Sequence, residues 1–250
     1  MNAVKKKSIG FGEFVALMAM LMSLVALSID TMLPALSEIG QSLGASRFNS
    51  HQLVIPFFFL GVSAGQLIYG PLSDSIGRKP AMYTGLGLYI SGCLLCLWAT
   101  SFPMMLTGRA VQGFGAAAPR IVSLALVRDQ YSGRAMARVM SFVMSLFIMV
   151  PIVAPIIGQF ILIMSGWRTI FGAFLLQALI TTTWFALRQP ETLAAENRTP
   201  ISTAWLASAL REIFTHRRAL GFTIISGLVG GAFMGFLNLA PQIFRDQYET

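Results

Sequence analysis

The stretch Val139–Met164, VMSFVMSLFIMVPIVAPIIGQFILIM, contains no Asp, Glu, Lys or Arg. As an α-helix it is longer than the roughly 20 residues that cross about 30 Å of hydrocarbon. Soluble domains coat their surface with charged side chains, and a helix of this composition has none to offer to water. The stretch therefore predicts a transmembrane helix, and the rest of the chain can be compared with it.

The remaining sequence repeats this pattern. Of the 250 residues, 55% are hydrophobic and 11% are charged, against about 25% charged in soluble domains. This composition excludes an ordinary soluble domain. Six further apolar runs of similar length are Phe14–Ala35, Leu53–Leu72, Ala81–Thr100, Pro103–Val127, Thr169–Leu187 and Leu220–Ile243. We therefore predict an all-α, polytopic membrane protein with seven transmembrane helices.

Basic residues predict the orientation of these spans. With the amino terminus in the cytoplasm, the inner segments hold thirteen of the 18 basic residues, namely Lys5, Lys6, Lys7, Arg78, Lys79, Arg128, Arg134, Arg138, Arg188, Arg198, Arg211, Arg217 and Arg218. The outer segments hold Arg47, Arg168 and Arg245. This asymmetry follows the positive-inside rule. Topology and anionic lipid then explain the net charge of +8, so no nucleic-acid partner is needed.

A polar segment separates the sixth run from the seventh. It predicts three parts: a six-span bundle over residues 1–187, a cytoplasmic linker over 188–219, and a seventh span with an external tail over 220–250. Within the linker, Thr203–Phe214 places apolar side chains at helical spacing, namely Trp205, Leu206, Leu210, Ile213 and Phe214. We predict an amphipathic helix on the membrane surface there.

Three ionisable residues fall inside predicted spans: Asp30, Arg109 and Arg120. Each costs about 2.5–3.5 kcal/mol in the bilayer on insertion scales, so these residues are candidates for function. Asp30 and Arg109 fall in the outer third of the membrane, and we predict that this acid and base neutralise each other. The alternative is that each side chain reaches the outer interface alone. Pro34, four residues after Asp30, predicts a bend beside the acid.

The fourth apolar run has one polar side. Arg120 follows Arg109 by eleven residues, about three helical turns, so the two share a face with Gln112 and Gly113. We predict that Gln112, Gly113 and Arg120 line a water-filled substrate cavity. For Arg120, the alternative is a structural contact with a neighbouring helix or with a lipid phosphate.

The fifth apolar run contains two prolines four residues apart, Pro151 and Pro155, followed by Gly158. Each proline removes one backbone donor from the helix. We predict a deformable point there, which serves either motion or only the shape of the helix.

No enzyme chemistry is indicated. Cys93 and Cys96 lie in one apolar run and are interpreted as apolar filler. His51 and His216 fall in predicted loops, and the spans contain no paired catalytic carboxylates, metal-ligand cluster or nucleophile motif. We predict a protein that is not an enzyme and holds no metal.

Several spaced motifs resemble one family. Gly70-Pro-Leu-Ser-Asp74-Ser-Ile-Gly77-Arg78-Lys79 resembles the loop signature between the second and third spans of the major facilitator superfamily, and Arg109-Ala-Val-Gln112-Gly113-Phe-Gly115 resembles its fourth-span motif. Val150–Gln159 is similar to the fifth-span motif of the drug:proton antiporters. With Asp30 and Val127-Arg128-Asp129, essentially the whole chain resembles bicyclomycin and chloramphenicol resistance efflux proteins of bacteria.

The resemblance implies a proton-coupled drug exporter in the bacterial cytoplasmic membrane. It needs no cofactor besides the proton gradient, and its partners are a small-molecule substrate, protons and the lipid bilayer. Asp30 and Arg109 would couple protonation to movement. The gating loop would consist of Gly70, Asp74, Gly77, Arg78 and Lys79, with Asp74 latching the two halves of the carrier, in part through Arg128. Pro151, Pro155 and Gly158 would form the fifth-span hinge.

Carriers of this family have two six-span halves, and alternating access needs both. The chain has one half plus a seventh span, so we expect a fragment that lacks a carboxyl-terminal bundle. The alternatives are a degenerate product and a chain that pairs with another. Two other functions stay open, an exporter of an anionic metabolite, favoured by Arg120, and a non-transporting assembly or regulatory subunit.

Overall fold

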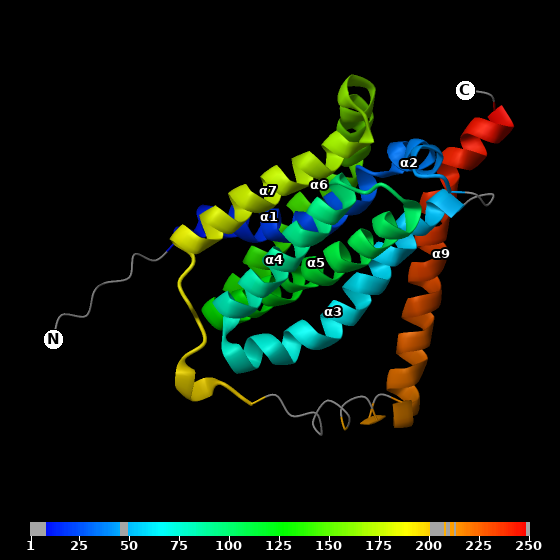
Figure 1. Ribbon diagram of the computed structural model, residues 1–250. Helices are drawn as coiled ribbons and strands as arrows, with labels where there is room; N and C mark the ends of the chain where they lie inside the picture. Colours follow the sequence, from blue (N-terminus) through cyan, green and yellow to red (C-terminus); the bar gives the residue numbers. More distant parts are fainter. Residues whose placement is uncertain (1–8, 46–49, 201–207, 209–210, 213, 249–250) are drawn as a thin grey trace. The chain divides into compact units, whose positions relative to one another are not determined.

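The computed structural model describes residues 9–45, 50–200, 208, 211–212 and 214–248 (Figure 1). The chain divides into two compact units, Met1–Thr199 and Pro200–Thr250. Most of the predicted amphipathic helix over Thr203–Phe214 lies outside the described residues, which include only 208, 211, 212 and 214 of this range. Every regular element in the described part of the chain is a helix, which confirms the predicted all-α class.

The first unit consists of six long helices with short helical segments between and after them. The long helices are α1 (Phe11–Asp30), α3 (Val54–Ile76), α4 (Arg78–Leu97), α5 (Phe102–Gln130), α6 (Gly133–Ser165) and α7 (Trp167–Arg188). The short segments are α2 (Leu36–Ser42) and the 3-10 turns η1 (Leu33–Ala35), η2 (Ser50–Leu53) and η3 (Ala195–Asn197). The second unit contains α9 (Arg217–Tyr248).

Six helical stretches within the described residues are long and apolar enough to cross a membrane. They coincide with the first six predicted spans, and the helix α6 contains the whole of the stretch Val139–Met164. The seventh predicted span, Leu220–Ile243, lies inside α9, which confirms a helix there. Its insertion in a membrane stays a prediction.

Helix α5 lies between α3 and α4 and also packs against α1 (Figure 1). The backbones approach closely because glycines face each contact. A Cβ added at Gly113 of α5 would lie 2.0 Å from the carbonyl oxygen of Phe58 in α3. A Cβ added at Gly92 of α4 would lie 2.3 Å from the backbone nitrogen of Gln112. Small residues permit such contacts in lipid, where apolar burial does not drive helices together.

The first unit continues past residue 187, the predicted end of the bundle, to Thr199. Gln189 is buried, and Glu191 and Thr192 are hydrogen bonded to α4 and α5. The beginning of the polar segment is therefore packed against the helices it follows.

Candidate functional site

Arg109 is fully buried in the first unit and donates to three acceptors from three helices. Its Nε donates to the Val54 carbonyl of α3 at 3.2 Å, and Nη2 donates to the Ser28 carbonyl of α1 at 3.0 Å. Its Nη1 donates to Oε1 of Gln112, one turn further along α5, at 2.7 Å. The guanidinium carbon also lies 4.3 Å from the ring centroid of Phe58. Dipoles and a π face therefore compensate the buried charge.

The polar network around Arg109 extends to α4. Gln112 Nε2 donates to Cys93 Sγ at 3.1 Å, and the Ser28 and Tyr89 hydroxyl oxygens lie 2.7 Å apart. Tyr89 and Cys93 are fully buried. Cys93 is thus more than the apolar filler that the sequence suggested, because its sulfur accepts a hydrogen bond. We call Ser28, Phe58, Tyr89, Cys93, Arg109 and Gln112 the Arg109 network.

Asp30 is the last residue of α1 and is 9% exposed. Within the described residues its carboxylate has no hydrogen-bond or ion-pair partner, so the predicted pair with Arg109 does not form. The physical reason is that the nearer acceptors on α1 and α3 are main-chain carbonyls, which occupy the guanidinium. Asp30 and Arg109 are instead linked through α1, since the Ser28 carbonyl lies in the same helical turn as Asp30.

The chain leaves α-helical geometry directly after Asp30, where the sequence predicted a bend. Thr31 caps α1, and Pro34 lies in the first turn of η1. At this point α1 meets α6, because a Cβ added at Gly158 would lie 2.1 Å from the Thr31 carbonyl oxygen. Helix α6 is continuous through Pro151 and Pro155, and their role as a hinge stays a prediction.

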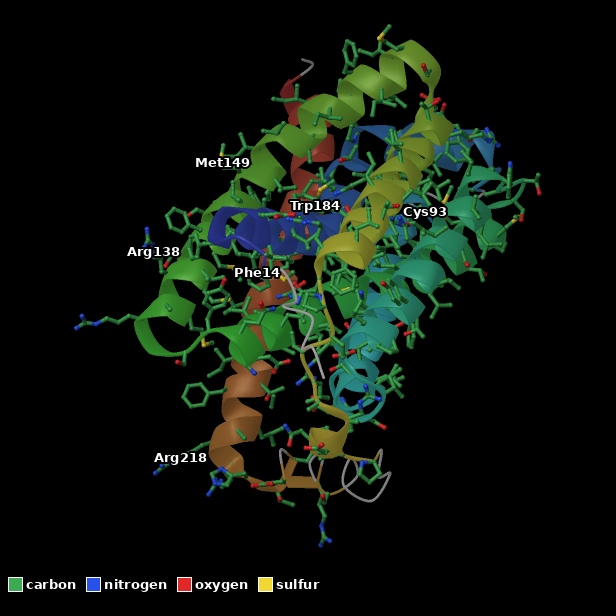
Figure 2. All side chains as sticks on the ribbon, turned by 90° about the vertical axis from the view of Figure 1, so that its left-hand side faces the viewer. Phe14, Cys93, Arg138, Met149, Trp184 and Arg218 are labelled. Carbon is green, nitrogen blue, oxygen red and sulfur yellow. The ribbon has the colours of Figure 1, made fainter. Side chains whose placement is uncertain are left out.

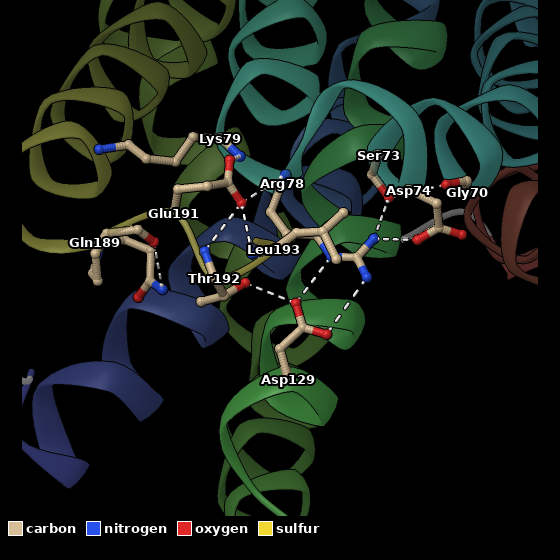
Figure 3. Close-up of polar contacts among 11 residues, drawn as sticks. Gly70, Ser73, Asp74, Arg78, Lys79, Asp129, Gln189, Glu191, Thr192 and Leu193 are labelled. Carbon is tan, nitrogen blue, oxygen red and sulfur yellow. Dashed lines mark hydrogen bonds and ion pairs between the residues drawn. The ribbon is translucent and has the colours of Figure 1, made fainter. Parts of the chain in front are cut away.

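A second polar site surrounds the turn between α3 and α4 (Figure 3). Gly77 forms this turn with a φ of 107°, a conformation that favours glycine. The Arg78 guanidinium forms an ion pair with Asp74, four residues earlier in the chain. It also donates to Ser73 Oγ at 2.9 Å and, across to the end of α5, to Asp129 Oδ2 at 3.0 Å.

Glu191 joins the segment after α7 to this site. Its carboxylate accepts from the backbone nitrogens of Arg78 and Lys79 at 3.0 and 2.9 Å, which are otherwise free donors at the start of α4. Burial acts to raise the pKa of Glu191, but four backbone N–H donors, from Leu193, Lys79, Arg78 and Thr192, outweigh it and lower the pKa. Thr192 Oγ1 donates to Asp129 at 2.7 Å. We call Ser73, Asp74, Arg78, Asp129, Glu191 and Thr192 the Arg78 cluster.

The sequence assigned some members of these sites and missed others. It named Arg128, which is exposed and has no ion-pair partner among the described residues, whereas the neighbouring Asp129 is bonded to Arg78. Of the predicted cavity residues, Gln112 and Gly113 are buried between helices, and Arg120 is exposed. Lys79 reaches the Ala186 carbonyl at 3.1 Å, and Gly70 accepts from Ser73 at 2.9 Å. Sequence signals for Tyr89 and Glu191 were absent, because their partners are 61 and more than 110 residues away.

Comparisons with known proteins agree with the motifs. The sequence profile of the Major Facilitator Superfamily matches residues 17–249. The chain is 32% identical to the "Bicyclomycin resistance protein homolog" of Haemophilus influenzae, over 94% of the chain and 59% of that protein. It is 31% identical to the "Uncharacterized MFS-type transporter YdgK" of Bacillus subtilis, over 93% of the chain and 58% of that protein.

Two more distant proteins are similar over most of the chain. The "Chloramphenicol resistance protein CraA" of Acinetobacter baumannii is 26% identical over 87% of the chain and 52% of that protein. The crystal structure of the human organic anion transporter MFSD10 superposes with a TM-score of 0.62 at 18% identity, over 80% of this chain and 53% of that one. The chain therefore spans little more than half the length of the curated relatives it matches.

Proposed function

Because this chain belongs to the major facilitator superfamily, we propose that it is the amino-terminal part of a carrier that expels small amphipathic drugs in exchange for protons. The names of the relatives support drugs as the substrate class, since they refer to resistance to bicyclomycin, to chloramphenicol and to multiple drugs. The chain covers 58% and 59% of the length of two relatives, which supports a missing carboxyl-terminal bundle. The cytoplasmic membrane of a bacterium is the place where such a carrier works.

One observation carries the proton-coupled part of this proposal: Asp30 is buried and has no cation beside it among the described residues. An unpaired carboxylate in an apolar environment is costly, and binding a proton removes its charge. The fully buried Arg109, whose charge is already compensated by carbonyls, does not fix Asp30 in the ionised form. Asp30 is therefore the group we assign to carry the proton.

The surroundings of Asp30 give its charge a route to the rest of the bundle. The same end of α1 is held by Arg109 of α5 at the Ser28 carbonyl and touches α6 at Gly158 through Thr31. A change of charge at Asp30 acts on both contacts. If outward-open and inward-open forms differ in these contacts, protonation shifts their populations, and substrate binding reciprocally shifts the affinity for protons.

We assign the Arg78 cluster to the gate at the other end of these helices. It connects α3, α4, α5 and the segment after α7 within one half of the carrier. The Asp74 side chain is 52% exposed although Arg78 is 9% exposed. One carboxylate oxygen of Asp74 is thus available to a donor from the second half, and breaking that contact would open this side.

The test uses the full-length protein in proteoliposomes with an imposed pH gradient. We expect Asp30→Asn to abolish gradient-driven accumulation of radiolabelled chloramphenicol, because the variant cannot exchange a proton. Glu38→Gln is the matched control, since Glu38 is an exposed carboxylate on α2. Accumulation by Asp30→Asn at the wild-type level would refute the role of Asp30.

Arg120 favours a second candidate function, the export of anions. It is exposed on α5 and has no ion-pair partner among the described residues. If the substrate is an anion, Arg120→Ala should lose binding of anionic dyes and keep binding of cationic dyes. The variant Arg120→Lys, which keeps the positive charge, should bind anionic dyes. Equal binding of both dye classes by Arg120→Ala would leave drug export as the function.

A further inference from the structure

Three helix ends meet at an aromatic cluster that the transport proposal does not use. Helix α1 begins at Phe11, α5 ends at Gln130 and α6 begins at Gly133. The rings of Phe11 and Tyr131 lie 6.4 Å apart, and those of Phe11 and Phe142 lie 6.1 Å apart, both edge to face. Tyr at the end of a membrane helix is typical of the boundary between lipid and water, and Tyr131 directly follows the end of α5.

Arg138 of α6 is held on this aromatic surface. Its guanidinium carbon lies 5.3 Å from the ring centroid of Phe11 and 6.0 Å from that of Phe142. Figure 2 shows Arg138 on the outward side of α6, whereas Phe14 lies among the helices. Arg134 lies one turn before Arg138 on α6, and both are exposed. The two guanidinium groups therefore lie on one helix face at the membrane boundary.

The positive charge of these two arginines is not compensated within the described part of the chain. The nearby acids have other partners: Glu13 accepts from Arg188 at 2.6 Å, and Asp129 accepts from Arg78. The first turn of α6 contains no acidic residue. No described carboxylate pairs with Arg134 or Arg138. An anion from outside the protein is the group that this site lacks.

We infer that Arg134 and Arg138 bind the phosphate of an anionic phospholipid, with Phe11 and Phe142 packed against its glycerol and upper acyl region. Guanidinium groups match phosphate oxygens with paired hydrogen bonds. The adjoining exposed rings, 38% for Phe11 and 48% for Phe142, suit the apolar part of the same molecule. A free inorganic anion would use the arginines only. The inference rests on the membrane-spanning bundle and is independent of which substrate is transported.

The test measures retention of phosphatidylglycerol and phosphatidylcholine by the full chain in detergent micelles, using native mass spectrometry. We expect the wild type to retain phosphatidylglycerol preferentially. Arg134→Gln combined with Arg138→Gln should weaken that retention about thirtyfold, since two basic contacts are lost. The pair Arg217→Gln and Arg218→Gln removes the same charge from α9 and should leave retention unchanged.

Two further measurements distinguish lipid binding from misfolding and from the binding of a free anion. Arg134→Lys with Arg138→Lys keeps the charge and should retain most of the lipid, which separates binding from misfolding. Millimolar inorganic phosphate should not displace phosphatidylglycerol. Displacement by phosphate would show that the arginines bind a free anion rather than a lipid. Equal losses of phosphatidylglycerol in the two double glutamine variants would show a general effect of charge rather than a specific site. Either result overturns the inference.

Discussion

Helices α5 and α6 follow each other in the chain and have opposite environments. In the most apolar 18-residue stretch of α5, 61% of residues are buried, against 11% in α6. Yet α6 is the more apolar of the two and α5 contains Arg109 and Gln112. In a water-soluble protein the more apolar helix would be the more buried of the two. The difference shows a bundle built for lipid, where polar groups are satisfied inside and the most apolar helix faces outward.

The two helices also differ in what holds them. The buried face of α5 includes a run of glycine and alanine, among them Gly113 and the fully buried Ala116, Ala117 and Ala118, so neighbouring backbones approach it closely there. Large apolar side chains of α6 such as Ile152, Ile156 and Phe160 are more than 60% exposed. The first unit leaves this apolar surface uncovered, as expected of a helix that faces acyl chains. Close backbone contact and polar bonds fix α5, and substitutions should therefore affect α5 far more than α6.

The largest effect is expected from Gly113→Leu. An added Cβ would lie 2.0 Å from the Phe58 carbonyl oxygen, so α3 and α5 must separate. We expect a loss of more than about 3 kcal/mol in the free energy of unfolding, or no folded protein. The control is Gly87→Leu on α4, where an added Cβ meets nothing within 4 Å. Equal melting temperatures for the two variants would contradict the backbone contact.

Arg109→Met should have the next largest effect. It leaves the carbonyl oxygens of Val54 and Ser28 and the amide oxygen of Gln112 without their donor, at a cost of about 3 kcal/mol. Arg109→Lys should recover only part of the stability, because an ammonium group keeps the charge but lacks the planar guanidinium that reaches three acceptors. The stability of both variants is measured by unfolding in increasing concentrations of a denaturing detergent. Wild-type stability in Arg109→Met would show that the network is not needed for the fold.

A smaller effect is expected where Glu191, in the segment after α7, caps the start of α4. The folded pKa of Glu191 is lowered below its ordinary value of 4.5, so its stabilisation is fully present above about pH 4.5 and is lost as pH falls through the lowered pKa. The melting temperature of the wild type should thus fall further on acidification than that of Glu191→Gln. Glu196→Gln, at an exposed carboxylate, is the control. If the melting temperatures of wild type and Glu191→Gln change in parallel with pH, Glu191 does not stabilise the start of α4.

The smallest effect is expected from Ile152→Ala on α6. This side chain is 68% exposed, so truncation should cost less than about 0.5 kcal/mol. Leu126→Ala, at a fully buried position of α5, should cost about 2 kcal/mol or more. Thermal unfolding in the same detergent compares the two directly. A larger loss for Ile152→Ala would mean that α6 has a protein contact within the chain that the first unit does not show.

Much of the fold was predictable because it depends on local composition. The absence of charge in Val139–Met164 is enough to predict a membrane-spanning helix, and α6 contains that stretch. Asp74 and Arg78 are also only four residues apart, and residues at this spacing lie close together on a helix or across a tight turn, so their ion pair depends on local sequence alone. These features need no knowledge of distant parts of the chain.

The partners of the buried charges were decided only by the tertiary structure. Arg109 was expected to bind Asp30, but it binds main-chain carbonyls, which every residue possesses and which therefore leave no mark in a sequence. Glu191 meets the start of α4 across more than 110 residues, a distance over which spacing has no meaning. Composition determined which segments enter the lipid. Packing of α1, α3 and α4 around α5 determined which polar groups meet inside it, because buried donors take whichever acceptors the folded backbones bring within reach.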